Sequence, residues 1–147
     1  MRQSGGGLDE RLAAAFGHAR PGAPALLVGM DTPQLDAASL AAPLAPGARA
    51  GADAWYGPAA DGGFWALGLA RPTAPLARQL LLGVPMSTPR TGEALLARLD
   101  AAGLRVGRLP RLTDVDDAAS AAEVAAAAPG TRFAARLAGI ATARAQR

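Results

Sequence analysis

The sequence predicts a single α/β domain over residues 1–147, with a mostly parallel sheet flanked by helices. Short apolar runs of strand length alternate along the chain with longer segments of helical periodicity, which is the order typical of α/β folds. Half of the residues are hydrophobic, which is enough for a real core in a chain of this length. No internal repeat or long linker divides the chain, so one domain is expected.

The first expected elements are a helix and a buried strand. Apolar residues recur on one face of Leu8–Ala19, and the following Arg-Pro-Gly ends this helix. The unbroken apolar run Ala25–Val28 is typical of a strand that is covered on both faces. Gly29 follows, and Asp31 stands at the expected carboxyl end of the strand, which is the edge where open α/β sheets bind ligands. Alternatively, Asp31 caps the helix expected from about residue 36 or orders an Asx-turn.

The middle of the chain is expected to form a short helix and two strands. The helix covers residues 36–44 and ends at nearby prolines and a glycine. Residues 53–58 and 64–69 are mostly apolar and contain aromatic residues, as strands often do. The Asp-Gly turn between them predicts a hairpin-like unit.

The second half alternates helices with one more strand. Leucines recur on one face of residues 90–102, and the glycine that follows is a suitable C-cap. Before this helix we expect a short helix within residues 71–82. After it we expect a strand at 104–109, an acidic loop at 113–117, an Ala-rich helix at 118–128 and a last helix from 131 to about 144.

Composition limits the classes of function. The chain has no cysteine, which excludes disulfides and thiolate metal sites, and its single histidine leaves no basis for a zinc site or a Ser-His-Asp triad. The beginning of the chain lacks the apolar core of a signal peptide, and no apolar run is long enough to span a membrane. We therefore expect a cytoplasmic protein without a membrane partner.

The net charge of +3 is unevenly distributed. Residues 1–129 contain 11 arginines and 12 acidic residues, whereas residues 130–147 contain 4 arginines and no acidic residue. This basic last helix could bind phosphates or nucleic acid, or it could dock on its own domain. We expect docking, and no nucleic-acid partner.

Four carboxylates in separate parts of the chain are candidates for a metal site. Asp31 and the pair Asp114 and Asp116 each follow an expected strand, so they could meet at one edge of the sheet. Asp114 and Asp116 would point the same way on an extended loop. Asp61 is the fourth. Mg²⁺ and Mn²⁺ take such oxygen ligands. Alternatively, Asp116 and Asp117 cap the Ala-rich helix, and Asp114 is simply exposed.

The turn that presents Asp61 is rich in glycine. Gly62 and Gly63 remove side chains beside Asp61, which suits the close approach of a sugar or phosphate and equally suits a plain hairpin turn. Aromatic residues flank the turn and could stack a base or a sugar, but we expect them to pack the sheet. They are Trp55, Tyr56, Phe64 and Trp65.

Four segments together resemble a known family: GMDTPQL, GPAADGGFWALGL, GVPMSTPRTGEALLARL and LPRLTDVDD. Their order and spacing are similar to those of the DUF2064 family, also called the glycosyltransferase A-like or selenodomain-associated transferase 1 family, from Leu8 to about Ala122. The resemblance implies a GT-A-like fold, that of nucleotide-diphospho-sugar transferases. Met86 replaces the family's usual Trp, and Ser120 replaces a common Asp. The family's opening strand and basic loop have no counterpart, so we expect an N-terminally truncated version with the first strand missing.

The resemblance also implies roles for particular residues. It makes Asp31 the carboxylate for metal and nucleotide, the Asp61–Gly63 segment the floor of the donor or acceptor pocket, and Asp114 with Asp116 a second acidic pair. The predicted site is therefore as follows: catalytic Asp61 and Asp31; nucleotide-binding Asp31, Gly29, Gly62 and Gly63; Mg²⁺ or Mn²⁺ ligands Asp31, Asp114 and Asp116.

We therefore predict a metal-dependent transferase that acts on a nucleotide-activated donor, with glycosyl transfer from a nucleotide-diphospho-sugar as the first choice. In this reaction Asp61 would orient a hydroxyl or act as general base. Two alternatives stay open. One is nucleotidyl transfer in the same fold. The other is a non-catalytic binding or assembly protein, in which a homodimer or a partner chain covers an exposed sheet edge.

Overall fold

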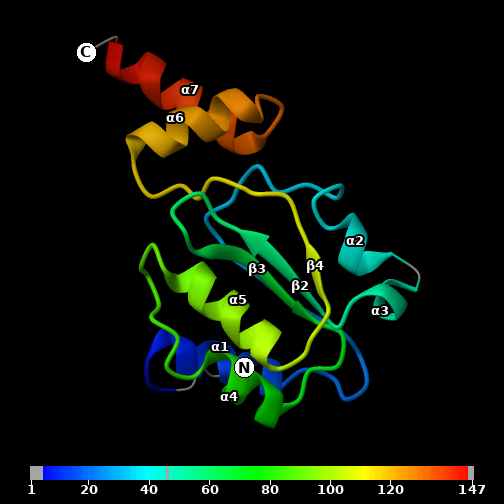
Figure 1. The fold of residues 1–147 in the computed structure, drawn as a ribbon. Helices are drawn as coiled ribbons and strands as arrows, with labels where there is room; N and C mark the ends of the chain where they lie inside the picture. Colours follow the sequence, from blue (N-terminus) through cyan, green and yellow to red (C-terminus); the bar gives the residue numbers. More distant parts are fainter. Residues whose placement is uncertain (1–4, 46, 146–147) are drawn as a thin grey trace.

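The computed structural model describes residues 5–45 and 47–145 (Figure 1). Helices and strands follow one another along the chain much as the sequence predicts. In order they are α1 (Leu8–Gly17), β1 (Ala25–Val28), α2 (Ala41–Leu44), α3 (Ala48–Gly51), β2 (Ala54–Pro58), β3 (Phe64–Leu69), α4 (Ala74–Leu81), α5 (Thr91–Ala101), β4 (Val106–Arg108), α6 (Ala118–Ala127) and α7 (Arg132–Ala145).

The described strands form one sheet in the order β1-β3-β2-β4. The predicted α/β class is confirmed, but the prediction of a mostly parallel sheet is wrong for these strands. β3 runs antiparallel to both β1 and β2, and only β2 and β4 are parallel. The turn at residues 59–63 explains the β2–β3 pair, because so short a connection can only return the chain antiparallel.

The helix predicted over residues 36–44 is shorter in the structure. α2 covers only Ala41–Leu44, and the separate short helix α3 follows it. The Asp36 carboxylate accepts hydrogen bonds from the Ser39 amide at 2.8 Å and from the Ser39 hydroxyl at 2.7 Å. This local side-chain pairing favours a turn at residues 36–39 over helix.

Both faces of the sheet are covered. α1, α4 and α5 lie together over one face, as Figure 1 shows, and bury leucines from the sheet and from α4 and α5: Leu67, Leu69, Leu80, Leu81, Leu95 and Leu99. On the other face Trp55, Trp65 and Leu109 pack with residues of the segment between β1 and β2. Trp55, Tyr56 and Trp65 are all at least 97% buried, which confirms that they pack the sheet.

A β-bulge determines where Trp65 packs. Gly57 pairs with Ala66, but Pro58 pairs with Phe64, so Trp65 is an extra residue on β3. Strict alternation would put Trp65 on the same face as Leu67. Instead it packs with Trp55 on the opposite face, and Phe64 packs with the leucine core. Bulges of this kind redirect side chains and are common beside functional sites.

The last two helices pack against each other and lie at the end of the molecule far from α1 and α4 (Figure 1). Asp117 is the N-cap of α6, because its carboxylate accepts from the Ser120 amide at 2.8 Å. This leaves the Asp116 side chain outside the cap. None of the helices in the described ranges is both long and apolar enough to cross a membrane.

An exposed ion pair joins the start of β2 to the chain just before β4, and it makes the stability depend on acid pH. Arg105 donates to Asp53 from Nε at 2.8 Å and from Nη2 at 3.1 Å, which holds the pKa of Asp53 at about 2, below its ordinary value of 3.8. A depressed carboxyl pKa stabilises the fold above the ordinary value, and this contribution is lost as the pH falls from 3.8 through about 2. We expect Asp53→Asn to have a lower melting temperature than the wild type above pH 5.

The difference in melting temperature should shrink steadily as the pH falls toward 2, where about half of the wild-type carboxyl groups are protonated. Thermal denaturation of both proteins between pH 2 and pH 7 measures it. A difference that stays constant across this range would contradict a contribution from the ionised pair.

Candidate active site

A pocket of about 490 Å³ opens where β1 ends. Its apolar wall includes Leu8 and Leu12 of α1, Leu27 of β1 and Phe64 of β3. Its polar part contains the carboxylates of Asp31, Asp61 and Asp114, and none of the described residues that line it carries a positive charge. The pocket therefore combines an apolar region with a strongly acidic one.

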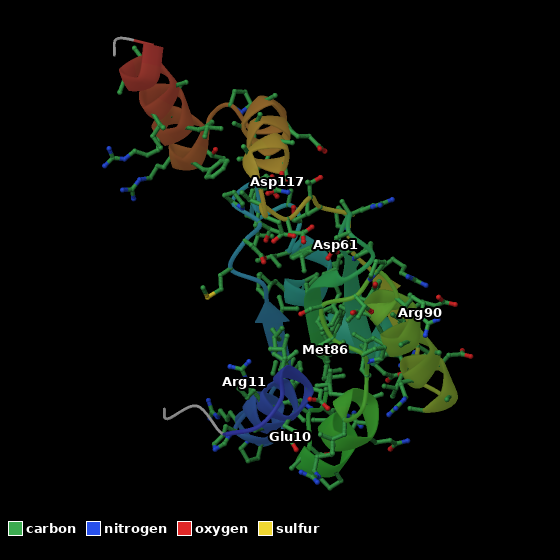
Figure 2. The ribbon with its side chains drawn as sticks, turned by 90° about the vertical axis from the view of Figure 1, so that its left-hand side faces the viewer. Glu10, Arg11, Asp61, Met86, Arg90 and Asp117 are labelled. Atoms are coloured by element: carbon green, nitrogen blue, oxygen red, sulfur yellow. The ribbon has the colours of Figure 1, made fainter. Side chains whose placement is uncertain are left out.

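Asp61 is held in the turn between β2 and β3. Its Oδ1 accepts from the Gly63 amide at 2.7 Å, which is an Asx-turn. Gly62 has φ +93°, and its carbonyl accepts from the Gly92 amide at 2.9 Å, where α5 begins. Arg111 donates to the carbonyl of Ala60 at 2.8 Å. Figure 2 shows Asp61 between Asp117, at the start of α6, and Met86, in the loop that precedes α5.

The loop after β4 carries Asp114 and Asp116 to this turn. Leu112 forms a parallel bridge with Ala59, and its amide donates to the carbonyl of Pro58 at 3.1 Å. The Trp65 ring Nε1 donates to the carbonyl of Pro110 at 2.8 Å. These contacts start the loop alongside β2, so that the following residues reach Asp61.

The structure brings Asp61, Asp114 and Asp116 together, with one carboxylate oxygen from each within 4.8 Å of the others. Asp114 is partly buried, and the other two side chains are exposed. Burial raises the pKa of Asp114 above its ordinary value, and the negative charges of Asp61, Asp116 and Asp31 raise it further. The three carboxylates would therefore be stabilised by a bound cation.

Asp31 lines the same pocket but lies outside that cluster. Its carbonyl accepts from the Val115 amide at 2.8 Å, and Gln34 donates to the carbonyl of Thr113 at 2.5 Å, so the segment after β1 is tied to the acidic loop. Gly29 donates to the carbonyl of Trp65 at 2.7 Å. A Cβ at Gly29 would lie 2.8 Å from Oδ1 of Asp31, so glycine leaves room for this carboxylate.

The pocket also contains residues that the sequence did not single out for it. Met86, Ser87 and Thr91 line it from the loop before α5 and from the first residue of α5. Ser87 has φ +56°, which is rare outside glycine and often marks a functional segment. Of the predicted glycines, Gly29 and Gly63 line the pocket, and Gly62 lies beside it in the turn.

Comparison with known proteins agrees with the sequence resemblance. The family model described as "Uncharacterized protein conserved in bacteria (DUF2064)" matches residues 1–88. The match includes Asp31 and Asp61, and the acidic loop lies beyond it. No curated protein matches the chain.

Among solved structures, the chain resembles the crystal structure of a protein named "putative nucleotide-diphospho-sugar transferase" from Desulfovibrio desulfuricans G20. The TM-score is 0.63, and the two sequences are 25% identical. The match covers 78% of this chain and 48% of that protein, so this chain spans about half the length of the protein it resembles. The chain therefore shares a fold of the nucleotide-diphospho-sugar transferase type.

Proposed function

Because the chain belongs to the DUF2064 family, we propose that it is a metal-dependent transferase that takes a glycosyl group from a nucleotide-diphospho-sugar. The observation that carries this proposal is the meeting of the Asp61, Asp114 and Asp116 carboxylates beside the pocket. A diphosphate is strongly anionic, and the charged side chains among the described residues that line the pocket are all carboxylates. A donor of this kind therefore needs a metal ion in order to bind there.

The cluster fits a hard divalent cation. Its three ligand oxygens lie within 4.8 Å of one another, a spacing that one ion with metal–oxygen distances of about 2.0–2.6 Å can bridge. All three ligands are carboxylates, which suits Mg²⁺ or Mn²⁺ better than softer metals. A bound ion would neutralise charge on the diphosphate leaving group.

The chain's own carboxylates would divide the remaining work. Asp114 and Asp116 hold the cation, with Asp61 as the third ligand or as the group that orients a hydroxyl and accepts its proton. Asp31, which lines the same pocket, is the further candidate for a metal ligand or a base. The backbone has no side chains at Gly29, Gly62 and Gly63, which leaves room for a nucleotide or sugar to approach closely.

The test is thermal denaturation of the whole chain with Mg²⁺ or Mn²⁺ and with UDP-, GDP- or CDP-linked sugars. A ligand present at 100 times its Kd should stabilise the wild type by about 2.7 kcal/mol. The stabilisation should disappear in Asp114→Asn and in Asp31→Asn. It should persist in Asp100→Asn, which changes an exposed carboxylate on α5.

Product analysis then separates the reactions. Glycosyl transfer releases a nucleoside diphosphate, whereas nucleotidyl transfer from a nucleoside triphosphate releases pyrophosphate. The absence of stabilisation by every metal–nucleotide pair would contradict the transferase proposal.

The edge of the sheet favours a second candidate function, that of a binding or assembly protein. β1 pairs only with β3 among the described strands, all four of its residues are apolar, and the nearby Met30 is fully exposed. Open strand edges pair readily with other strands. A stable dimer by light scattering, together with no response to any nucleotide, would favour a second copy or a partner chain on this edge.

A further inference from the structure

Tyr56 reaches from β2 to the turn that carries Asp61. Its side chain is 97% buried, Phe64 lies beside the ring, and the Arg108 guanidinium stacks 5.4 Å from the ring centroid. Its hydroxyl donates to the carbonyl of Gly63 at 3.1 Å. Burial is the main cause that raises the pKa of Tyr56 above its ordinary value, so the hydroxyl is a donor at neutral pH.

The turn at Gly62 and Gly63 is also held from a second side, by the start of α5. The Gly92 amide donates to the carbonyl of Gly62 at 2.9 Å. A Cβ at Gly92 would collide with the Tyr56 hydroxyl and would lie 2.8 Å from the carbonyl oxygens of both Gly62 and Gly63. The start of α5 and the Tyr56 hydroxyl therefore approach the turn closely and act on neighbouring carbonyls.

This turn also fixes the carboxylate of Asp61. Gly63 accepts from the Tyr56 hydroxyl through its carbonyl, and on the other side of its Cα its amide donates to Asp61 at 2.7 Å. Asp61 is exposed and lies beside two other negative charges, so repulsion favours side-chain rotamers that point away from Asp114 and Asp116. A turn with a fixed backbone limits how far the Asp61 carboxylate can move away from the other two.

We propose that Tyr56 is a positioning residue that holds Asp61 in the Asp61–Asp114–Asp116 cluster through Gly63. The inference rests on the proposed function, because it concerns the same metal site. Tyr56 itself contacts neither the metal nor the substrate. Its role is to pre-organise one ligand, as hydrogen bonds behind metal ligands commonly do.

The test is Mn²⁺ affinity, measured by the electron paramagnetic resonance signal of free Mn²⁺, in the whole chain without any nucleotide. A lost hydrogen bond of ordinary strength corresponds to roughly a 2- to 13-fold change in a binding constant. We expect Tyr56→Phe, which keeps the buried ring, to bind Mn²⁺ about 3- to 10-fold more weakly.

Two controls distinguish positioning from general loosening. Thr73→Ala removes the N-cap hydrogen bond of α4, which lies outside the candidate site, and should lower the melting temperature without changing Mn²⁺ affinity. In an Asp61→Asn background, Tyr56→Phe should have no further effect on Mn²⁺ affinity, because its effect passes through Asp61.

The outcomes separate the two proposals. If the wild type binds Mn²⁺ and Tyr56→Phe binds it equally well, this inference is overturned and the proposed metal site stands. An additive effect of Tyr56→Phe in the Asp61→Asn background also overturns it. If the wild type does not bind Mn²⁺, the proposed metal site and this inference fall together.

Discussion

Replacing Gly62 with alanine should lower the free energy of unfolding by about 2–5 kcal/mol. Two costs combine at this position. Gly62 has φ +93°, a conformation that costs an L-residue about 1–2 kcal/mol. In addition, a Cβ would collide with the backbone carbonyl of Pro89, which cannot rotate out of the way as a flexible side chain can. Urea denaturation monitored by tryptophan fluorescence measures the loss.

Two other glycines separate these costs. Gly22 has φ +74°, and a Cβ there would meet nothing within 4 Å, so Gly22→Ala measures the backbone cost alone. Gly51 has neither a positive φ nor a close neighbour, so Gly51→Ala should be nearly neutral. If Gly62→Ala were no more destabilising than Gly22→Ala, the close approach of the turn to α5 would not matter to stability.

Gly62→Ala should also affect the site. The turn cannot keep both its contact with α5 and a new methyl group, so Asp61 should leave its position beside Asp114. We expect a larger loss of Mn²⁺ affinity in Gly62→Ala than in Tyr56→Phe, because the backbone itself moves and not only one of its hydrogen bonds.

Local patterns predicted most of the strands and helices. The apolar run Ala25–Val28 is a strand with the predicted bounds, and so are residues 64–69. The Asp-Gly turn between β2 and β3 predicted their antiparallel pairing. These features depend on neighbours in sequence, which is why the residues alone reveal them.

Strand direction in the rest of the sheet depends on contacts between distant segments. β1 pairs with β3, about 40 residues further along the chain, and no local pattern indicates that partner or its direction. The bulge at Trp65 is equally hidden, because β3 reads FWALGL and has no alternation of polar and apolar residues that would show which side chains share a face. The bulge follows from packing on the two faces of the sheet, with Trp65 on one face and Phe64 on the other.

The candidate site shows the same division. The sequence predicts Asp31, Asp114 and Asp116 as the metal ligands and Asp61 as a catalytic group, whereas in the structure it is Asp61 that lies with Asp114 and Asp116. Asp61 and Asp114 are brought together by the Ala59–Leu112 bridge, which joins segments about 50 residues apart. The sequence alone does not show whether Asp116 or Asp117 is the N-cap of α6. In the structure the N-cap is Asp117.

Trp65→Ala should produce a loss of stability of about 3–5 kcal/mol, as large as that of any single substitution in the described core. Trp65 is 99% buried, and Gly57 has no side chain because a Cβ there would lie 2.5 Å from the Trp65 ring. Removing the indole therefore leaves a cavity that the backbone of β2 cannot fill. Met30→Ala is the matched control, since Met30 is fully exposed and its truncation should change stability by less than about 0.5 kcal/mol.

Trp65→Phe tests the link from this core to the acidic loop. Phenylalanine keeps most of the packing but removes the donor to the carbonyl of Pro110, which should cost about 1–3 kcal/mol. Since that bond anchors the start of the loop, the amides of Leu112 and Val115 should exchange with solvent faster, even though their own acceptors, Pro58 and Asp31, are unchanged. Amide exchange by NMR measures this. Unchanged exchange at both amides would mean that the loop carrying Asp114 is held independently of Trp65, and that the bulge serves packing alone.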